Sequence, residues 1–270
     1  MPHKAKISAL VITYNEMDNI KRCIDSIAFA DEIIVVDSYS TDGTFEFLKL
    51  YPRVKVLQRA FKNYTDQKAY TLQQASHDWV LFIDADEVVT DVLQEEIIAT
   101  INNTPIYNAF WFYRTFMFKN RKMHFSGLQT DKNYRLFRKS KVSFDPNKLV
   151  HETLKVQGAS GILNNHLTHY SYKDYNSYKA KIMSYGQLKA QQAYRSGKKF
   201  SYSKLILKPL WKFTTYYLIR LGFLDGLKGL IFSYIQATGE IERFRTLKQL
   251  EESRTAVLSI PQKTTSLKSA

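Results

Sequence analysis

Short apolar runs alternate with segments of helical periodicity along the first 100 residues. The apolar runs, at 7–12, 33–36, 54–57 and 79–83, are short and rich in β-branched residues, which predicts buried strands. The segments between them repeat apolar residues at helical spacing, as Ile20, Cys23, Ile24 and Ile27 do. Strands that alternate with helices predict a mostly parallel sheet with right-handed crossovers.

The fourth predicted strand changes abruptly from apolar to acidic, from Trp79-Val80-Leu81-Phe82-Ile83 to Asp84-Ala85-Asp86-Glu87. Side chains alternate along a strand, so Asp84 and Asp86 are expected to point to the same side and could share one hard divalent cation. The alternative is a strand that simply ends there, with Asp86 or Thr90 capping the helix that follows. The short acidic pattern alone does not decide between these interpretations.

Polar residues also follow two other predicted strands: Thr13, Asn15 and Glu16 follow the first, and Asp37 follows the second. Ligands of parallel sheets bind outside the carboxyl ends of the strands, so these side chains are expected near one site. The chain has no glycine-rich dinucleotide or P-loop motif, which leaves a nucleotide site built from carboxylates. Taken singly, Asp37 could be a turn former and Glu16 a charge in the first turn of a helix.

Four ordered motifs resemble the family 2 glycosyltransferases of GT-A fold, and within them the lipopolysaccharide core β-1,4-glucosyltransferase group. They are VITYNE at 11–16, VVDS at 35–38, TDGT at 41–44 and DWVLFIDADE at 78–87, and the resemblance covers about residues 1–175. It implies an α/β fold of GT-A type, the nucleotide-diphospho-sugar transferase fold, with a mostly parallel sheet flanked by helices. A C-terminal helical extension follows.

The resemblance also implies roles for individual residues. Thr13, Glu16 and Asp37 would contact uridine, with Asn15 and Ala85 in the same nucleotide-sugar site. Asp86 with Asp84 would hold a divalent metal, Mg²⁺ or Mn²⁺, and Lys68 would lie near the diphosphate. Asp84 and Arg135 would also belong to the nucleotide-sugar site. Relatives often carry Lys-Asn after the glutamine where this chain has Gln67-Lys68-Ala69, so position 69 receives no role.

Glu152 is the candidate catalytic base. Inverting sugar transfer is a single displacement, which needs one carboxylate to remove the proton of the acceptor hydroxyl while a metal stabilises the leaving diphosphate. Without the family pattern, an ordinary glutamate at a strand end would be the better interpretation. His169 could complete the metal shell, bond a phosphate oxygen or be structural, and Arg135 with Arg138 could clamp phosphate or form a solvated basic turn.

The positive charge is concentrated towards the C-terminus. Residues 173–228 hold 12 Lys and Arg against 2 Asp and Glu (net +10), whereas residues 1–100 hold 10 against 16 (net −6). Helices are expected at 175–194, from Pro209 onwards, and from 227 through 252, with a disordered tail after them. Their uncharged runs fall short of the ~20 residues that span a bilayer. Aromatic and basic residues mixed along short helices favour an anionic membrane surface, and packing on the catalytic domain or on a second copy is the alternative.

The resemblance and the C-terminal pattern together imply a nucleotide-sugar-binding half (1–107), an acceptor half (108–175), a basic helical extension (176–255) and a disordered tail (256–270). The single cysteine and the lack of an apolar segment at residues 1–7 predict a cytoplasmic protein. The basic helices and the resemblance to lipopolysaccharide enzymes add the expectation that it is peripheral on the inner face of a bacterial inner membrane. The predicted reaction moves a hexose, with UDP-glucose as expected donor, onto a lipopolysaccharide inner-core acceptor.

Alternatives are a different lipid-linked or protein acceptor, or a non-catalytic basic protein that binds membrane or nucleic acid. Carboxylates at three strand ends would repel a polyanion, so nucleic acid is not an expected partner. A nucleotidyltransferase would need a glycine-rich loop after the first strand, where residues 13–18 contain no glycine.

Overall fold

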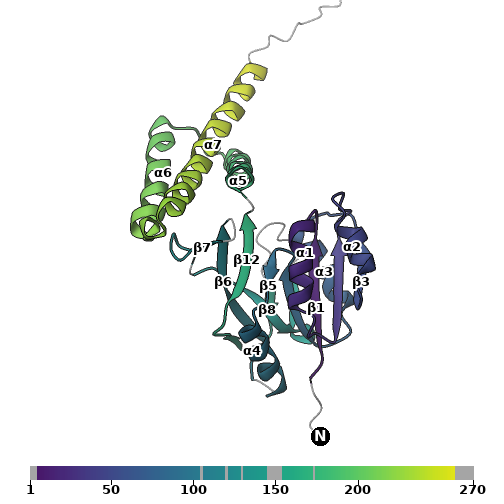
Figure 1. Ribbon diagram of the computed structural model, residues 1–270. Helices are drawn as coiled ribbons and strands as arrows, with labels where there is room; N and C mark the ends of the chain where they lie inside the picture. Colours follow the sequence, from purple (N-terminus) through teal and green to yellow (C-terminus); the bar gives the residue numbers. More distant parts are fainter. Residues whose placement is uncertain are drawn as a thin grey trace, which may run out of the picture. The chain divides into compact units, whose positions relative to one another are not determined.

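The computed structural model describes residues 5–103, 106–118, 121–128, 130–144, 154–172 and 174–258 (Figure 1). Contacts within the chain divide it into two compact units. The first comprises Met1–His124 and Leu128–Ser171, and the second comprises Phe125–Gly127 and Tyr172–Ala270.

The first unit is built on a sheet whose N-terminal half is parallel. Strand β1 (Ile7–Thr13) lies between β2 (Glu32–Asp37) and β4 (Trp79–Asp84), and β3 (Val54–Gln58) pairs with the far side of β2. These are the four strands that the apolar runs predict. All four run the same way, so their carboxyl ends meet at one edge of the sheet.

Antiparallel strands continue the sheet beyond β4. Strand β8 (Lys132–Arg138) pairs with β4, then come β6 (Ala109–Phe118), β12 (Leu167–Tyr172) and β5 (Glu87–Val88). Two short strands pair with β6, namely β7 (Arg121–Lys122) and β11 (Ser160–Ile162). A 3-10 turn, Lys139–Lys141, leads to β9 (Val142–Phe144), which forms a separate two-stranded sheet with β10 (Leu154–Val156).

Helices cover both faces of the parallel half. Helices α1 (Met17–Ser26), α2 (Thr44–Leu50) and α4 (Asp91–Asn102) contribute to the same buried cluster as Ala9, Val11 and Leu81. Leu72 near the end of α3 (Tyr64–Gln74) packs in a second cluster with the intervening Leu10 and Val80. Because side chains alternate along each strand, they pack into two cores, one on each face of the sheet. The predicted α/β fold, a mostly parallel sheet flanked by helices, is confirmed.

The second unit is helical. It contains α5 (Tyr175–Arg195), α6 (Tyr202–Thr214), a π-helical turn η2 (Thr215–Ile219), a 3-10 turn η3 (Gly222–Asp225) and α7 (Leu227–Leu258). Helices α5 and α6 both pack on α7. A Cβ at Gly186 of α5 would lie 2.5 Å from the carbonyl oxygen of Gly239, so glycine permits the close approach of α5 to α7. Among the described helices, none combines the length and the apolar character needed to cross a membrane.

Two expectations for this unit are corrected. Pro209 does not begin a helix: α6 begins seven residues earlier, at Tyr202, and carries Pro209 buried in its interior. A proline can continue an established helix at the loss of one backbone hydrogen bond, so its fixed φ did not mark the start. Helix α7 continues to Leu258, past the predicted start of the tail at 256, and residues 259–270 lie outside the described part of the chain.

Leu81 and Leu50 offer a matched test of the core. Leu81 in β4 is fully buried, whereas Leu50 at the end of α2 is 85% exposed. Leu81→Ala is expected to lower the free energy of unfolding by about 2–5 kcal/mol, because it removes buried methyl groups and leaves a cavity. Leu50→Ala is expected to change it by less than ~0.5 kcal/mol. Urea denaturation measures both, and equal losses would contradict the described core.

Candidate functional site

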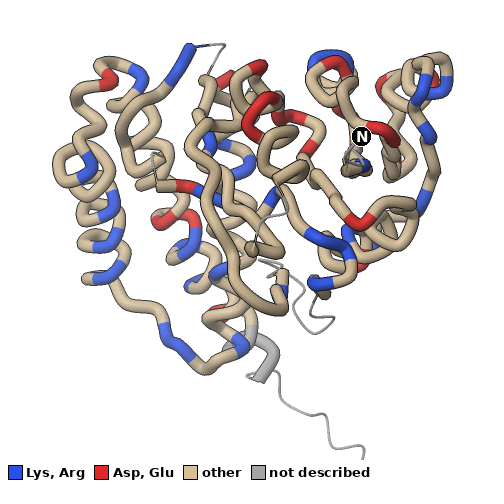
Figure 2. Tube along the Cα trace, turned by 90° about the horizontal axis from the view of Figure 1, so that it is seen from below, with Lys and Arg blue, Asp and Glu red and all other residues tan. Residues whose placement is uncertain are grey.

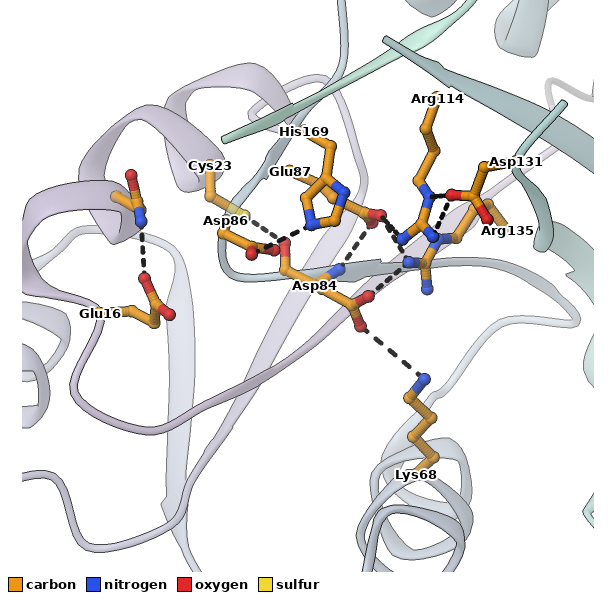
Figure 3. A network of polar contacts seen from close by, with 11 residues as sticks. Glu16, Cys23, Lys68, Asp84, Asp86, Glu87, Arg114, Asp131, Arg135 and His169 are labelled. Carbon is orange, nitrogen blue, oxygen red and sulfur yellow. Dashed lines mark hydrogen bonds and ion pairs between the residues drawn. The ribbon is translucent and has the colours of Figure 1, made fainter. Parts of the chain in front are cut away.

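The turn between β4 and β5 is built around the carboxylate of Glu87. Glu87 is fully buried, and its Oε2 accepts the backbone N–H of Asp84 at 2.9 Å. Its Oε1 accepts from Nη1 of Arg114 at 3.2 Å and from Nη2 of Arg135 at 2.5 Å (Figure 3). A buried carboxylate is tolerated when such charged donors compensate its lost hydration, so strands β5, β6 and β8 are tied together at this point.

Asp84, the last residue of β4, faces cations. Nη2 of Arg135 also contacts Asp84 Oδ2, and Nζ of Lys68 on α3 lies 3.8 Å from Oδ1. Burial alone would raise the pKa of Asp84, but the charges of Arg135 and Lys68 outweigh it and hold that pKa below its ordinary value. Burial alone would lower the pKa of Arg135, but the negative charges of Asp84 and Glu87 outweigh it and raise that pKa. Both groups are therefore ionised at neutral pH.

Asp86 has a different partner. Its Oδ2 lies 3.1 Å from Nε2 of His169. Strand pairing explains the contact: β12 runs antiparallel to β5 with His169 opposite Glu87, and the N–H of Tyr170 donates to the backbone carbonyl of Asp86 at 2.8 Å. The argument that Asp84 and Asp86 share one side of a strand is wrong, because β4 ends at Asp84 and Asp86 lies in the turn before β5.

The loops after β1 and β2 are joined by hydrogen bonds. Asn15 adopts a left-handed backbone (φ 55°), and its Oδ1 accepts the N–H of Thr41 at 2.8 Å. The N–H of Glu16 donates to Oγ1 of Thr44 at 3.0 Å. Motifs 11–16 and 41–44 are thus two sides of one loop pair, which the sequence alone does not reveal.

Thr13 and Asp37 are adjacent in strand register at the base of this loop pair. Asp37 is fully buried and accepts from the N–H of Ser40 at 3.0 Å and from Nε2 of Gln58 at 3.1 Å, as a turn-forming carboxylate does. The hydroxyl oxygen of Thr13 is also buried and has no hydrogen-bond partner among the described residues. An unpartnered buried hydroxyl is costly, so Thr13 is suited to a polar ligand group.

The predicted residues fall into two neighbouring groups. Asp84, Asp86, Lys68, Arg135 and His169 form one, with Ala85 buried in the turn between the two aspartates. Thr13, Asn15, Glu16 and Asp37 lie at the ends of β1 and β2, and Ile12 pairs with Asp84 in register, so both groups occupy the same edge of the sheet. Glu152 and His151 lie outside the described residues.

Arg138 does not join Arg135 in a clamp. Its Nη1 lies 3.5 Å from Oδ2 of Asp78, and its guanidinium covers the ring of Trp79 at 4.3 Å. The two arginines are three residues apart on β8, and an odd spacing places them on opposite faces of a strand. Arg138 therefore contacts the beginning of β4, at the opposite end of the strand from Asp84.

A metal site with three protein ligands is not present among the described residues. Asp86 and His169 nevertheless offer a carboxylate oxygen and an imidazole nitrogen side by side. Mg²⁺ sites commonly use only one or two protein groups and complete the shell with water and substrate phosphates. The donors at this turn therefore fit a divalent cation that binds together with a diphosphate.

Three members of the cluster, Glu87, Arg114 and Asp131, received no role from the sequence. Arg114 Nε donates to Asp131 Oδ2 at 2.6 Å and so links the cluster to the loop before β8. A sequence indication of Arg114 did exist, because position 114 is in phase with the buried Phe112 and Phe116 of β6. A charged residue at a buried strand position implies a buried partner.

Comparisons with known proteins find glycosyltransferases that are similar to this chain over most of its length. The family described as Glycosyl transferase family 2 matches residues 8–158. An uncharacterized glycosyltransferase of Rickettsia typhi is 32% identical over 94% of this chain and 91% of its own length. The lipopolysaccharide core biosynthesis glycosyltransferase LpsC of Rhizobium meliloti is 29% identical over 92% of each chain. The crystal structure of S. aureus TarS 1–349 in complex with UDP aligns over 93% of this chain and 92% of that chain, with 17% identity and a TM-score of 0.46.

Glu87→Gln tests the buried cluster. The amide keeps an acceptor for the N–H of Asp84 but leaves Arg114 and Arg135 without the shared negative charge, so the free energy of unfolding is expected to fall by about 3 kcal/mol. Glu95→Gln on the exposed side of α4 is the matched control and should change it by less than ~0.5 kcal/mol. Urea denaturation at pH 7 measures both. A Glu87→Gln protein as stable as the control would show that the cluster does not hold the turn.

Proposed function

The chain belongs to glycosyl transferase family 2, and from that premise we propose that it transfers glucose from UDP-glucose to a lipopolysaccharide inner-core acceptor with inversion at the anomeric carbon. The enzyme class predicted from the motifs, a glycosyltransferase, is confirmed by the family. The observation that carries the proposal is the convergence of the Asp84–Glu87 turn and the loops after β1 and β2 at one edge of the sheet.

Each group at that edge receives a role in the proposal. Residues 1–107 bind the donor: Thr13, Asn15, Glu16 and Asp37 hold uridine. The buried hydroxyl of Thr13, which has no partner in the part of the chain that the structure describes, supports this placement. Asp86 and His169 hold Mg²⁺ or Mn²⁺, whose charge offsets that of the leaving diphosphate.

Lys68 and Arg135 add positive charge beside the same diphosphate. Asp84, anchored by both cations, is less available than Asp86 as a metal ligand. Its side chain is 31% exposed, so it remains accessible to the donor.

The transfer step uses residues of the acceptor half, 108–175. Glu152 removes the proton of the acceptor hydroxyl, whose oxygen attacks the anomeric carbon from the side opposite the departing UDP. One displacement at that carbon inverts its configuration. A double displacement would need a covalent nucleophile supported by a neighbouring base, and the sequence offers no such pair among its motifs.

The acceptor assignment has a separate basis. LpsC, which is similar over 92% of this chain, is named for lipopolysaccharide core biosynthesis. We extend that acceptor class to this chain, and with it a cytoplasmic location, peripheral on the inner face of a bacterial inner membrane. The basic helical extension, 176–255, would then serve the lipid-linked acceptor.

Asp86→Ala tests the metal site without an acceptor. UDP-glucose is expected to raise the unfolding temperature of the wild-type chain more with Mn²⁺ than without it, because the cation joins Asp86 to the diphosphate. In Asp86→Ala the Mn²⁺-dependent part of the shift should disappear. Asp91→Ala, an exposed aspartate on α4, is the control and should keep it. An unchanged Mn²⁺ response in Asp86→Ala would remove Asp86 from the metal site.

Glu152→Gln tests the base. The variant should bind UDP-glucose with unchanged affinity, because the proposed base does not touch the donor nucleotide, while transfer falls by about 10²–10⁴-fold, the usual contribution of a general base. Calorimetry of donor binding and a transfer assay with purified core acceptor measure the two quantities. Normal turnover would exclude Glu152, and lost donor binding would place it in the nucleotide site instead.

A further inference from the structure

The second unit exposes an unusual number of large apolar side chains on consecutive elements. Ile206, Leu207, Leu210 and Trp211 of α6 are each between 60% and 67% exposed. The same character continues through the turns into α7, where the exposed residues are Leu218, Ile219, Leu221, Phe223, Leu224 and Leu227. Contiguous exposed apolar surface of this kind marks an interaction site. These residues are here called the α6–η3 face.

Helix geometry places the apolar residues of α6 outward. Ile206 and Leu210 are four residues apart, as are Leu207 and Trp211, so each pair lies on one side of the helix. The opposite side is the one that packs: Leu205 contacts the cluster of Ala190, Phe244 and Leu247, and Pro209 is buried. Helix α6 is therefore apolar towards solvent as well as towards its neighbours.

Basic residues border this surface. Lys204, Lys208 and Lys212 recur every four residues along α6 and form a row beside the exposed leucines, which Figure 2 shows as repeated basic positions on the helix at its left. Residues 202–230 hold five Lys and Arg and only one acidic residue, Asp225. That carboxylate accepts the N–H of Phe125 at 2.9 Å, so it is held by the second unit's own backbone.

Exposed apolar side chains with a basic border favour an anionic membrane over a second copy of the chain as the partner of this face. A second copy docked on this face through two-fold symmetry would place the same lysine rows near one another, and like charges repel. An anionic bilayer accepts both features, because apolar side chains enter the boundary below the headgroups while lysines meet the lipid phosphates. None of the described helices can cross a bilayer, so this contact would lie in the plane of the membrane.

We propose that the α6–η3 face is a docking surface for an anionic phospholipid bilayer, with Leu210 and Trp211 inserted at headgroup level and Lys204 and Lys208 on lipid phosphates. The inference deepens the proposed function and rests on it for its purpose, which is to bring the enzyme to a lipid-linked acceptor. Its test needs neither donor nor acceptor, so the two can fail separately.

Vesicle flotation of the full chain is the experiment. Wild-type protein should float with vesicles of phosphatidylglycerol and phosphatidylethanolamine and much less with phosphatidylcholine alone. The double variant Leu210→Ser/Trp211→Ser should bind the anionic vesicles about tenfold or more weakly, because each lost apolar side chain removes a large share of the transfer free energy. Circular dichroism should show both proteins equally folded, since the two side chains are exposed.

Matched controls come from α5. Leu188 is 53% exposed and lies two residues after the buried Gly186, on the side of α5 turned away from α7, so Leu188→Ser should float like the wild type. Lys204→Glu/Lys208→Glu should lose the preference for anionic lipid, whereas Lys179→Glu/Lys189→Glu, also exposed, should largely keep it. Both pairs change the net charge equally, so this comparison separates a local surface from general basicity.

Three outcomes would overturn the proposal. The wild type could fail to float, or Leu210→Ser/Trp211→Ser could float equally well. Light scattering could also show that the wild type is a dimer and that Leu210→Ser/Trp211→Ser is a monomer. The last would assign the face to a second copy. The change in unfolding temperature that UDP-glucose causes in the same proteins tests the proposed function independently. Loss of flotation with an unchanged shift supports the docking surface, and flotation without any UDP-glucose shift would reject the donor assignment alone.

Discussion

The shared carboxylate of Glu87 is the interaction on which the site depends. It receives two guanidinium groups and the N–H of Asp84 while fully buried, and it thereby fixes the position at which β4 ends and β5 begins. A turn of this kind would otherwise leave polar backbone groups without partners. Since β5 also pairs with β12, the same carboxylate indirectly determines the position of His169.

The acidic residues near Glu87 differ in the charged partners that they contact. Asp84, Glu87 and Asp131 face Arg114, Arg135 and Lys68, so three negative groups meet three positive ones. Asp86 lies beside the imidazole of His169, with 3.1 Å between Oδ2 and Nε2. Asp84 already faces the cations of Arg135 and Lys68, and its lowered pKa reflects them.

The second unit is held together by helix packing and not by a charged cluster. Its helices pack through small and aromatic residues, as in the approach of Gly186 to Gly239 and the stacking of Tyr178 on Phe232 at 5.2 Å between ring centroids. Leu205 and Pro209 of α6 are packed inward, whereas Ile206, Leu207, Leu210 and Trp211 stay exposed. These exposed side chains have a basic border, an arrangement that a purely structural helical extension would not need.

The sequence by itself determined the four parallel strands, the helices between them and the family, because periodicity and ordered motifs are local properties of the chain. It also singled out Asp84, Asp86 and Asp37 as candidates for the site, since polar residues after buried strands are visible without coordinates. Only the tertiary structure decided which partner each one has: Lys68, Arg135 and His169 reach the turn from α3, β8 and β12, and such pairings depend on strand order and register. The same holds for Glu87 and for Pro209, because burial inside a charged cluster or inside a continuing helix is settled by neighbours distant in sequence, not by the residues on either side.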